Sequence, residues 1–142
     1  KVARASAERL LKEEVSERTV VKSWTQLLDY CRIHIGHNTN EEFHVLFLNG
    51  KLELIADERQ QKGTVDHTPV YPREVVKRAL ELGASSLILV HNHPSGDVNP
   101  SKADVDVTKQ IVDAARSLGI EVYDHLIIGP KKHFSFKSKG II

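Results

Sequence analysis

Short apolar runs bounded by turn residues predict the β-strands of this sequence. Two of these runs flank Asn49-Gly50, which is the strongest short-range signal for a β-hairpin. A third run, SLILV, ends directly at His91. The predicted strands are residues 43–48, 51–56, 86–90, 121–128 and 133–136.

Apolar positions that recur near every 3.6 residues predict helices between these strands. The predicted helices are residues 2–15, 24–35, 72–82 and 102–118. Gly36, Gly83 and Gly119 follow the last three, and glycine commonly ends helices because it adopts left-handed backbone angles without strain. Residues 60–71 are polar, which predicts a loop or a weak edge strand that could border a substrate groove.

Length and composition describe about one soluble domain. The chain has 142 residues, of which 40% are hydrophobic, with 20 basic against 19 acidic side chains. This near balance creates no field that would by itself imply nucleic acid. No apolar run approaches the roughly 18 residues that span a bilayer, so we expect no membrane association. The chain begins at Lys1 rather than methionine, which allows for a further domain upstream.

The single cysteine, Cys31, excludes an intramolecular disulfide. It lies within a helical pattern, where a small buried residue is the simplest interpretation. A free thiol suits a reducing compartment, so we expect a cytoplasmic protein.

Most of the candidate functional residues follow directly after the predicted strand at residues 86–90. His91 and His93 are two positions apart, so their side chains point the same way from an extended chain. A turn follows, and Ser101 then opens a helix whose first turn carries Asp104. Two imidazoles and one carboxylate make three protein ligands, the number typical of catalytic rather than structural zinc. The pattern predicts a zinc site on His91, His93 and Asp104 with one open position.

Each part of this pattern also has a purely structural interpretation. Ser101-Lys102-Ala103-Asp104 matches the Ser-x-x-acid start of a helix, which needs no metal. Asn92 to Gly96 could form an ordinary turn. A hydroxyl both donates and accepts hydrogen bonds, so capping does not exclude Ser101 from catalysis. The three features together favour the metal interpretation. The Pro-Cys-x-x-Cys half of a zinc deaminase and the sequence His-Glu-x-x-His are both absent.

The spacing His91-x-His93, seven residues, Ser101, two residues, Asp104 resembles the JAMM motif of the JAB, or MPN, metalloprotease fold. Further sequences around it, from about Glu41 to the C-terminus, are similar to the RadC-like branch of that fold. They are Tyr71-Pro72-Arg73-Glu74, His91-Asn92-His93-Pro94-Ser95-Gly96, Pro100-Ser101-x-x-Asp104 and Asp124-His125.

This resemblance implies an α/β (α+β) fold that is JAB/MPN-like and cytidine-deaminase-like, with a curved mixed β-sheet flanked by helices. The RadC-like domain would occupy residues 37–142, after an N-terminal helical segment at residues 1–36. The resemblance also implies one Zn²⁺ on the three ligands, a water activated by that zinc, and a Ser101 hydroxyl that assists the oxyanion.

The same family uses a glutamate just before a buried strand as the base that takes the water proton. Here Glu41 and Glu42 precede the strand at residues 43–48. We choose Glu41, because its offset from the strand fits the RadC-like pattern best, and Glu42 remains the alternative.

These parts predict a zinc-dependent hydrolase, most simply a metallopeptidase or isopeptidase with a peptide or protein substrate. The alternative is a DNA-processing nuclease or DNA-binding module, because RadC-like proteins are traditionally described under DNA repair. Only a basic and aromatic C-terminal stretch favours nucleic acid, and a solvated hairpin explains it more simply. Its lysines are Lys131, Lys132, Lys137 and Lys139. A third class, a binding module with a vestigial metal site, predicts a missing ligand, whereas every ligand is present.

Two groups of residues are left open by the sequence. Asp124-His125, at the predicted start of a strand, could orient the zinc ligands or could form an edge pair that faces water. The other histidines, His34, His37, His44 and His67, are scattered without ligand spacing, and we interpret them as structural or surface residues.

Overall fold

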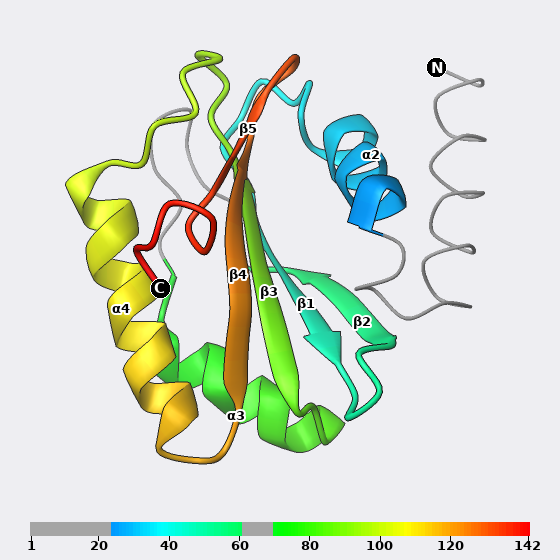
Figure 1. The fold of residues 1–142 in the computed structure, drawn as a ribbon, viewed down its shortest axis with the longest axis vertical. Coiled ribbons are helices and arrows are strands. Elements are labelled where there is room, and N and C mark those ends of the chain that lie inside the picture. Colours follow the sequence, from blue (N-terminus) through cyan, green and yellow to red (C-terminus); the bar gives the residue numbers. More distant parts are fainter. Residues whose placement is uncertain (1–23, 61–69) are drawn as a thin grey trace.

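The computed structural model describes residues 24–60 and 70–142, which form a sheet with helices on both faces (Figure 1). The predicted helix at residues 2–15 and most of the loop at residues 60–71 lie outside the described residues. The elements are α2 (Trp24–His34), β1 (Phe43–Leu48), β2 (Leu54–Arg59), α3 (Pro72–Leu82), β3 (Ser86–Asn92), α4 (Lys102–Arg116), β4 (Glu121–Ile128) and β5 (His133–Ser135).

The strand order is β2-β1-β3-β4-β5, in a mixed sheet. β3 and β4 are parallel, and the other neighbouring pairs are antiparallel. Parallel neighbours need a crossover, and α4 supplies it. This arrangement confirms the predicted α/β fold with a mixed sheet flanked by helices.

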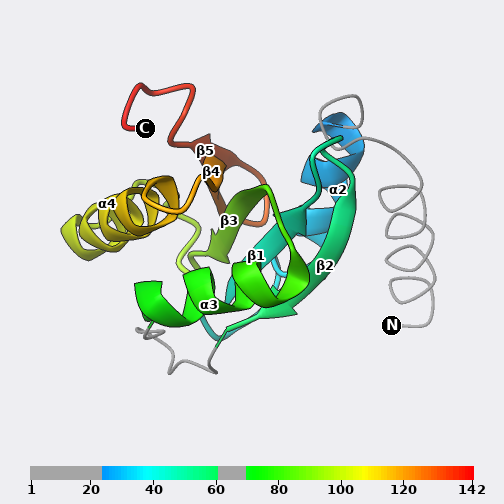
Figure 2. The same cartoon turned by 90° about the horizontal axis from the view of Figure 1, so that it is seen from below.

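The hydrophobic core has one layer on each face of the sheet. On one face α2 packs through Leu27 and Cys31 against Leu46 and Val90. α3 and α4 cover the other face, where Phe47 lies in their apolar cluster. Figure 2 shows this division, with α2 on one side of the sheet and α3 and α4 on the other. All residues of β1 and β3 are buried, because these inner strands are covered from both sides.

Local signals set the ends of the helices much as the sequence predicts. α3 begins at Pro72, whose fixed φ suits a first helical position, and it is closed by Gly83 at φ 67°. α4 follows the N-cap Ser101. It ends at Arg116, two residues before the predicted end, and the chain turns before Gly119, which has φ 72°.

The predicted hairpin forms, but its second strand begins later than expected. The Asn49 side chain accepts hydrogen bonds from the Lys51 N–H (2.9 Å) and the Glu53 N–H (3.0 Å). Leu52 adopts φ 60° between them. These bonds stabilise a longer loop than the two-residue turn that Asn-Gly favours, so β2 starts at Leu54 rather than at residue 51.

The crossover places the predicted chemistry at one end of the sheet. β3 runs toward His91, the chain turns, and α4 starts at that same end with Asp104 in its first turn (Figure 1). Among the described residues no helix is long and apolar enough to cross a membrane.

Candidate metal centre

The structure brings together the three predicted ligands. Nε2 of His91 lies 3.1 Å from Nε2 of His93 and 3.4 Å from Oδ1 of Asp104. Nε2 of His93 lies 3.1 Å from Oδ2 of Asp104. Ligands held tetrahedrally at zinc distances lie about 3.3 Å from one another. The separations in this group are close to that value, so its three side chains could hold a zinc ion.

His93 is oriented through the nitrogen that faces away from the centre. Its Nδ1–H donates to the Asp97 carbonyl at 2.8 Å, which leaves the Nε2 lone pair directed at the other ligands. Burial alone would lower the pKa of His93. The Asp104 carboxylate, the Asp97 carbonyl and the charge of Glu41 outweigh burial and raise that pKa above its ordinary value.

His91 is held by a buried chain of hydrogen bonds. Its Nδ1 lies 2.7 Å from Nε2 of His125, and Nδ1 of His125 lies 2.6 Å from the Thr108 hydroxyl. That hydroxyl donates to the Asp104 carbonyl at 2.6 Å. One proton arrangement satisfies every group: His91 donates to His125, His125 donates to Thr108, and Thr108 donates to the backbone. The chain thus joins one ligand to the helical turn that carries another.

A neutral His125 is what this arrangement requires. Burial, together with the nearby His91, lowers the pKa of His125 well below its ordinary value. Its Nε2 can therefore accept the His91 proton and keep Nε2 of His91 unprotonated toward the centre.

The adjacent residues Asp124 and His125 make different contacts in the structure. Both lie within β4 rather than at its start, and both are buried, so the water-facing interpretation is wrong. His125 contacts His91. The Asp124 carboxylate instead accepts from the Ser135 hydroxyl (2.6 Å) and the Lys137 N–H (2.9 Å). Asp124 fixes the C-terminal turn, and the orienting role falls to His125.

Ser101 and Asp104 form a complete capping box at the start of α4. The Ser101 hydroxyl accepts from the Asp104 N–H at 3.0 Å, and the Ser101 N–H donates to Oδ2 of Asp104 at 2.8 Å. Burial favours the neutral acid, but in the metal-free protein the two imidazoles, when they carry a proton on Nε2, and this N–H hold the pKa of Asp104 well below its usual range. The cap thus aims an ionised carboxylate at the centre, and the Ser101 O–H keeps its ability to donate.

The adjacent glutamates differ in their surroundings. Glu42 lies against His44, with Oε1 to Nε2 at 3.1 Å, and within 3.5 Å of the Arg59 guanidinium. His44 points to the α2 face of the sheet. Glu41 instead acts electrostatically on His93. Glu41 lies two positions before Phe43, whose ring stacks on His91 at 5.5 Å between centroids. The choice of Glu41 rather than Glu42 as the base stays a prediction.

Asn92, between the two histidine ligands, is a residue that the sequence reasoning assigned only to a turn. It is fully buried. Its Nδ2 donates to the Asn40 carbonyl at 3.1 Å, and its Oδ1 accepts from the Glu42 N–H at 2.6 Å. The Asn92 side chain thus bonds to the backbone on both sides of Glu41 and holds that segment against β3. The position of Asn92, between two predicted ligands at the end of an apolar strand, was the sequence signal that could have indicated this buried role.

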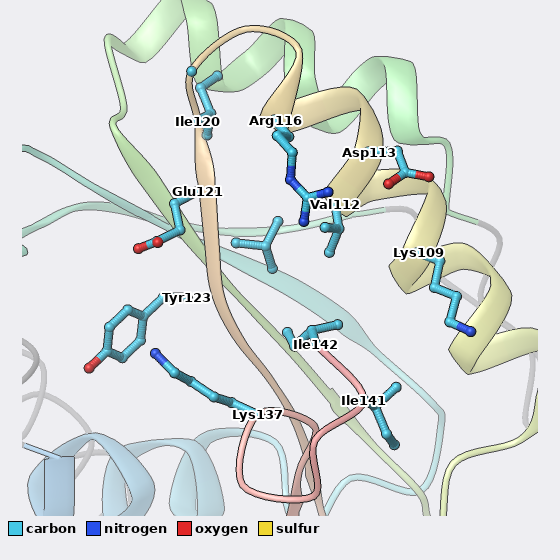
Figure 3. A pocket seen from close by; sticks show the side chains of 12 residues that line it. Lys109, Val112, Asp113, Arg116, Ile120, Glu121, Tyr123, Lys137, Ile141 and Ile142 are labelled. Carbon is cyan, nitrogen blue, oxygen red and sulfur yellow. The ribbon is translucent and has the colours of Figure 1, made fainter.

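A separate cavity of about 580 Å³ opens between α4, β4 and the C-terminal segment (Figure 3). None of the proposed ligands lines it. Arg116 and Lys137 reach it, with the Lys137 ammonium 4.2 Å from the centre of the Tyr123 ring. Asp113 and Glu121 lie in the same wall, so its charge is mixed rather than uniformly basic. This cavity does not strengthen the nucleic-acid alternative.

Replacing Asn92 by Ala should lower the free energy of unfolding by about 1–3 kcal/mol, because buried backbone groups lose their partners. Amide exchange at Glu42 should accelerate, since its N–H loses the bond to Asn92. Denaturant unfolding and hydrogen exchange measure both effects. The control is Asn99→Ala, which removes an exposed amide and should change little. Equal stability of the two variants would show that Asn92 does not hold this segment.

Comparison with known proteins gives a consistent result. The family model of the RadC-like JAB domain matches residues 21–141. A protein of Rhodobacter capsulatus described as a UPF0758 protein is 56% identical over 142 residues, which is 100% of this chain and 66% of that protein. The chain thus spans just under two thirds of the length of this relative. It belongs to the RadC-like JAB domain family.

Proposed function

We propose that this protein is a zinc-dependent hydrolase of the JAMM type that cleaves peptide or isopeptide bonds. The observation that carries the proposal is the cluster of two imidazole nitrogens and one carboxylate 3.1–3.4 Å apart. Three protein ligands leave room for a reacting group, as in catalytic zinc sites. Membership of a JAB domain family agrees with a metal-dependent protein.

When bound, zinc supplies a Lewis acid that polarises a carbonyl and lowers the pKa of water toward 7. The residues of the chain supply the remaining functions. Glu41 accepts a proton from the attacking water and returns it to the leaving amine as the C–N bond breaks. The Ser101 O–H donates to the oxygen on which negative charge develops. His125 and the Asp97 carbonyl hold the two imidazoles in the tautomers that metal binding needs.

An amide bond is the substrate class that these roles fit best. Its hydrolysis needs stabilisation of an oxyanion and protonation of a poor leaving group, and Ser101 and Glu41 provide these two functions. A phosphodiester substrate would draw on a surface that neutralises phosphates. The overall charge of +1 offers little general attraction for a polyanion.

Loss of a proposed ligand should lower the zinc content of the protein. His93→Ala and Asp104→Asn should each lower the zinc content by about one ion per chain relative to the wild type, because two ligands rarely retain zinc. Elemental analysis after purification without chelators measures this. His133→Ala removes an exposed histidine far from the ligands in sequence and should leave the content unchanged. Wild-type zinc content in both ligand variants would refute the assignment.

Separate replacement of the two adjacent glutamates tests which one is the base. Glu41→Gln should retain zinc but lose turnover by roughly 10²- to 10⁴-fold, because the amide cannot carry the proton. Glu42→Gln is the matched control and should retain most of the activity. The assay uses fluorogenic peptides and lysine isopeptide conjugates, with a DNA-cleavage assay in parallel. Loss only in Glu42→Gln would move the base by one residue, and metal-dependent DNA cleavage without peptide hydrolysis would replace the proposal.

The zinc affinity of the proposed site should depend on pH. A proton competes with zinc for Nε2 of His93. Because the pKa of His93 is raised above 6.5, the protonated form persists at higher pH than in a free imidazole. As the pH is lowered, zinc affinity should therefore begin to fall before pH 6.5 is reached. Asp104 stays ionised over this range. Zinc titrations against a competing dye from about pH 8 to about pH 5 measure this, and constant affinity over that range would contradict it.

A further inference from the structure

A second group of metal-ligand side chains lies on the opposite face of the sheet. His34 ends α2, His44 lies on β1 and Asp57 lies on β2. Their donor atoms all lie within 4.8 Å of one another. Nδ1 of His44 is 3.0 Å from Oδ1 of Asp57, and Nε2 of His34 is 3.9 Å from Oδ2. The sequence interpretation of His34 and His44 as scattered residues missed this convergence.

We propose that His34, His44 and Asp57 form a second zinc site, which ties α2 to the first two strands of the sheet. The donor set is two imidazoles and one carboxylate, the same as in the first centre. Zinc accepts this mixture of nitrogen and oxygen donors, whereas magnesium and calcium prefer oxygen alone. The proposal goes beyond the hydrolase activity and is independent of it.

The contacts around the ligands support this assignment. Nε2 of His44, the nitrogen facing away from Asp57, lies 3.1 Å from Oε1 of Glu42. A carboxylate in that position is the usual partner of a zinc-bound histidine, because it fixes the tautomer that directs the other nitrogen at the metal. The Tyr30 hydroxyl donates to Asp57 and holds this carboxylate in place.

Burial and space also fit an ion. The side chains of His44 and Asp57 are 7% and 3% exposed, whereas His34 is 33% exposed and leaves a route from solvent. A cavity of about 10 Å³ lies beside these residues and is also lined by apolar side chains of the core. The space for an ion is set by the donor atoms themselves, which lie within 4.8 Å of one another.

The same residues also form a buried ion pair when His44 carries a proton. Burial opposes that charge, but Asp57 and Glu42 outweigh it and raise the pKa of His44. Either a proton or zinc can thus occupy Nδ1 of His44. Metal content distinguishes the two states.

The experiment uses the chain with the first centre removed by His93→Ala and Asp104→Asn. After incubation with zinc chloride and removal of excess ion, this double variant should hold about one zinc per chain. Adding His34→Ala should abolish that zinc. His37→Ala, which removes an exposed histidine three residues away, should retain it. His34 is the most exposed of the three ligands, so its loss should leave folding intact.

Thermal unfolding gives a second measurement on the same proteins. Zinc that binds only the folded state raises the unfolding temperature. The double variant and its His37→Ala form should show this rise, the His34→Ala form should lose it, and magnesium should not produce it.

Two results would overturn the proposal: a double variant without zinc, or zinc binding and an unfolding shift that survive His34→Ala. If the first centre does not bind zinc, the variants show a different pattern of zinc content. In that case the wild type holds zinc that is insensitive to His93→Ala and is lost with His34→Ala.

Discussion

A buried imidazole needs a partner for each ring nitrogen. In His91 this requirement connects the candidate centre to side chains of β4 and α4. His91 is 1% exposed. Nε2 faces the other proposed ligands, while Nδ1 meets His125, which in turn meets Thr108. The two partners come from β4 and α4, so the orientation of one ligand depends on the whole crossover from β3 to β4. A change in the packing of α4 would alter the candidate centre even if every proposed ligand remained.

The alternation of side chains along β1 separates the chemistry of the two faces. Phe43 stacks on His91 on the side covered by α3 and α4, whereas His44 points toward α2. The adjacent glutamates follow the same division, with Glu41 acting on His93 and Glu42 bonded to His44. A shift of one residue would exchange the two faces. The anchoring of this segment by Asn92 is therefore as important as the identity of the acids.

Much of the fold was predictable because its signals are local. Pro72 and Gly83 delimit α3, and an uninterrupted apolar run marks β3. The start of β2 was not predictable, because the Asn49 side chain stabilises a longer loop than its dipeptide suggests. In the candidate centre, the convergence of His91, His93 and Asp104 was predictable from spacing, since one short loop joins the strand end to the helix start. The boundary predicted between residues 36 and 37 stays a prediction.

By itself, the sequence determined which residue types could meet, namely two histidines two positions apart and an acid in the next helical turn. It also determined the mixed helix and strand content. Only the tertiary structure decided the partners of those groups: His125 for His91, Asn92 for the backbone around Glu41, and His34 with His44 and Asp57. Each of these contacts joins elements far apart in the chain. Their formation depends on strand register and helix packing, which short-range spacing does not encode.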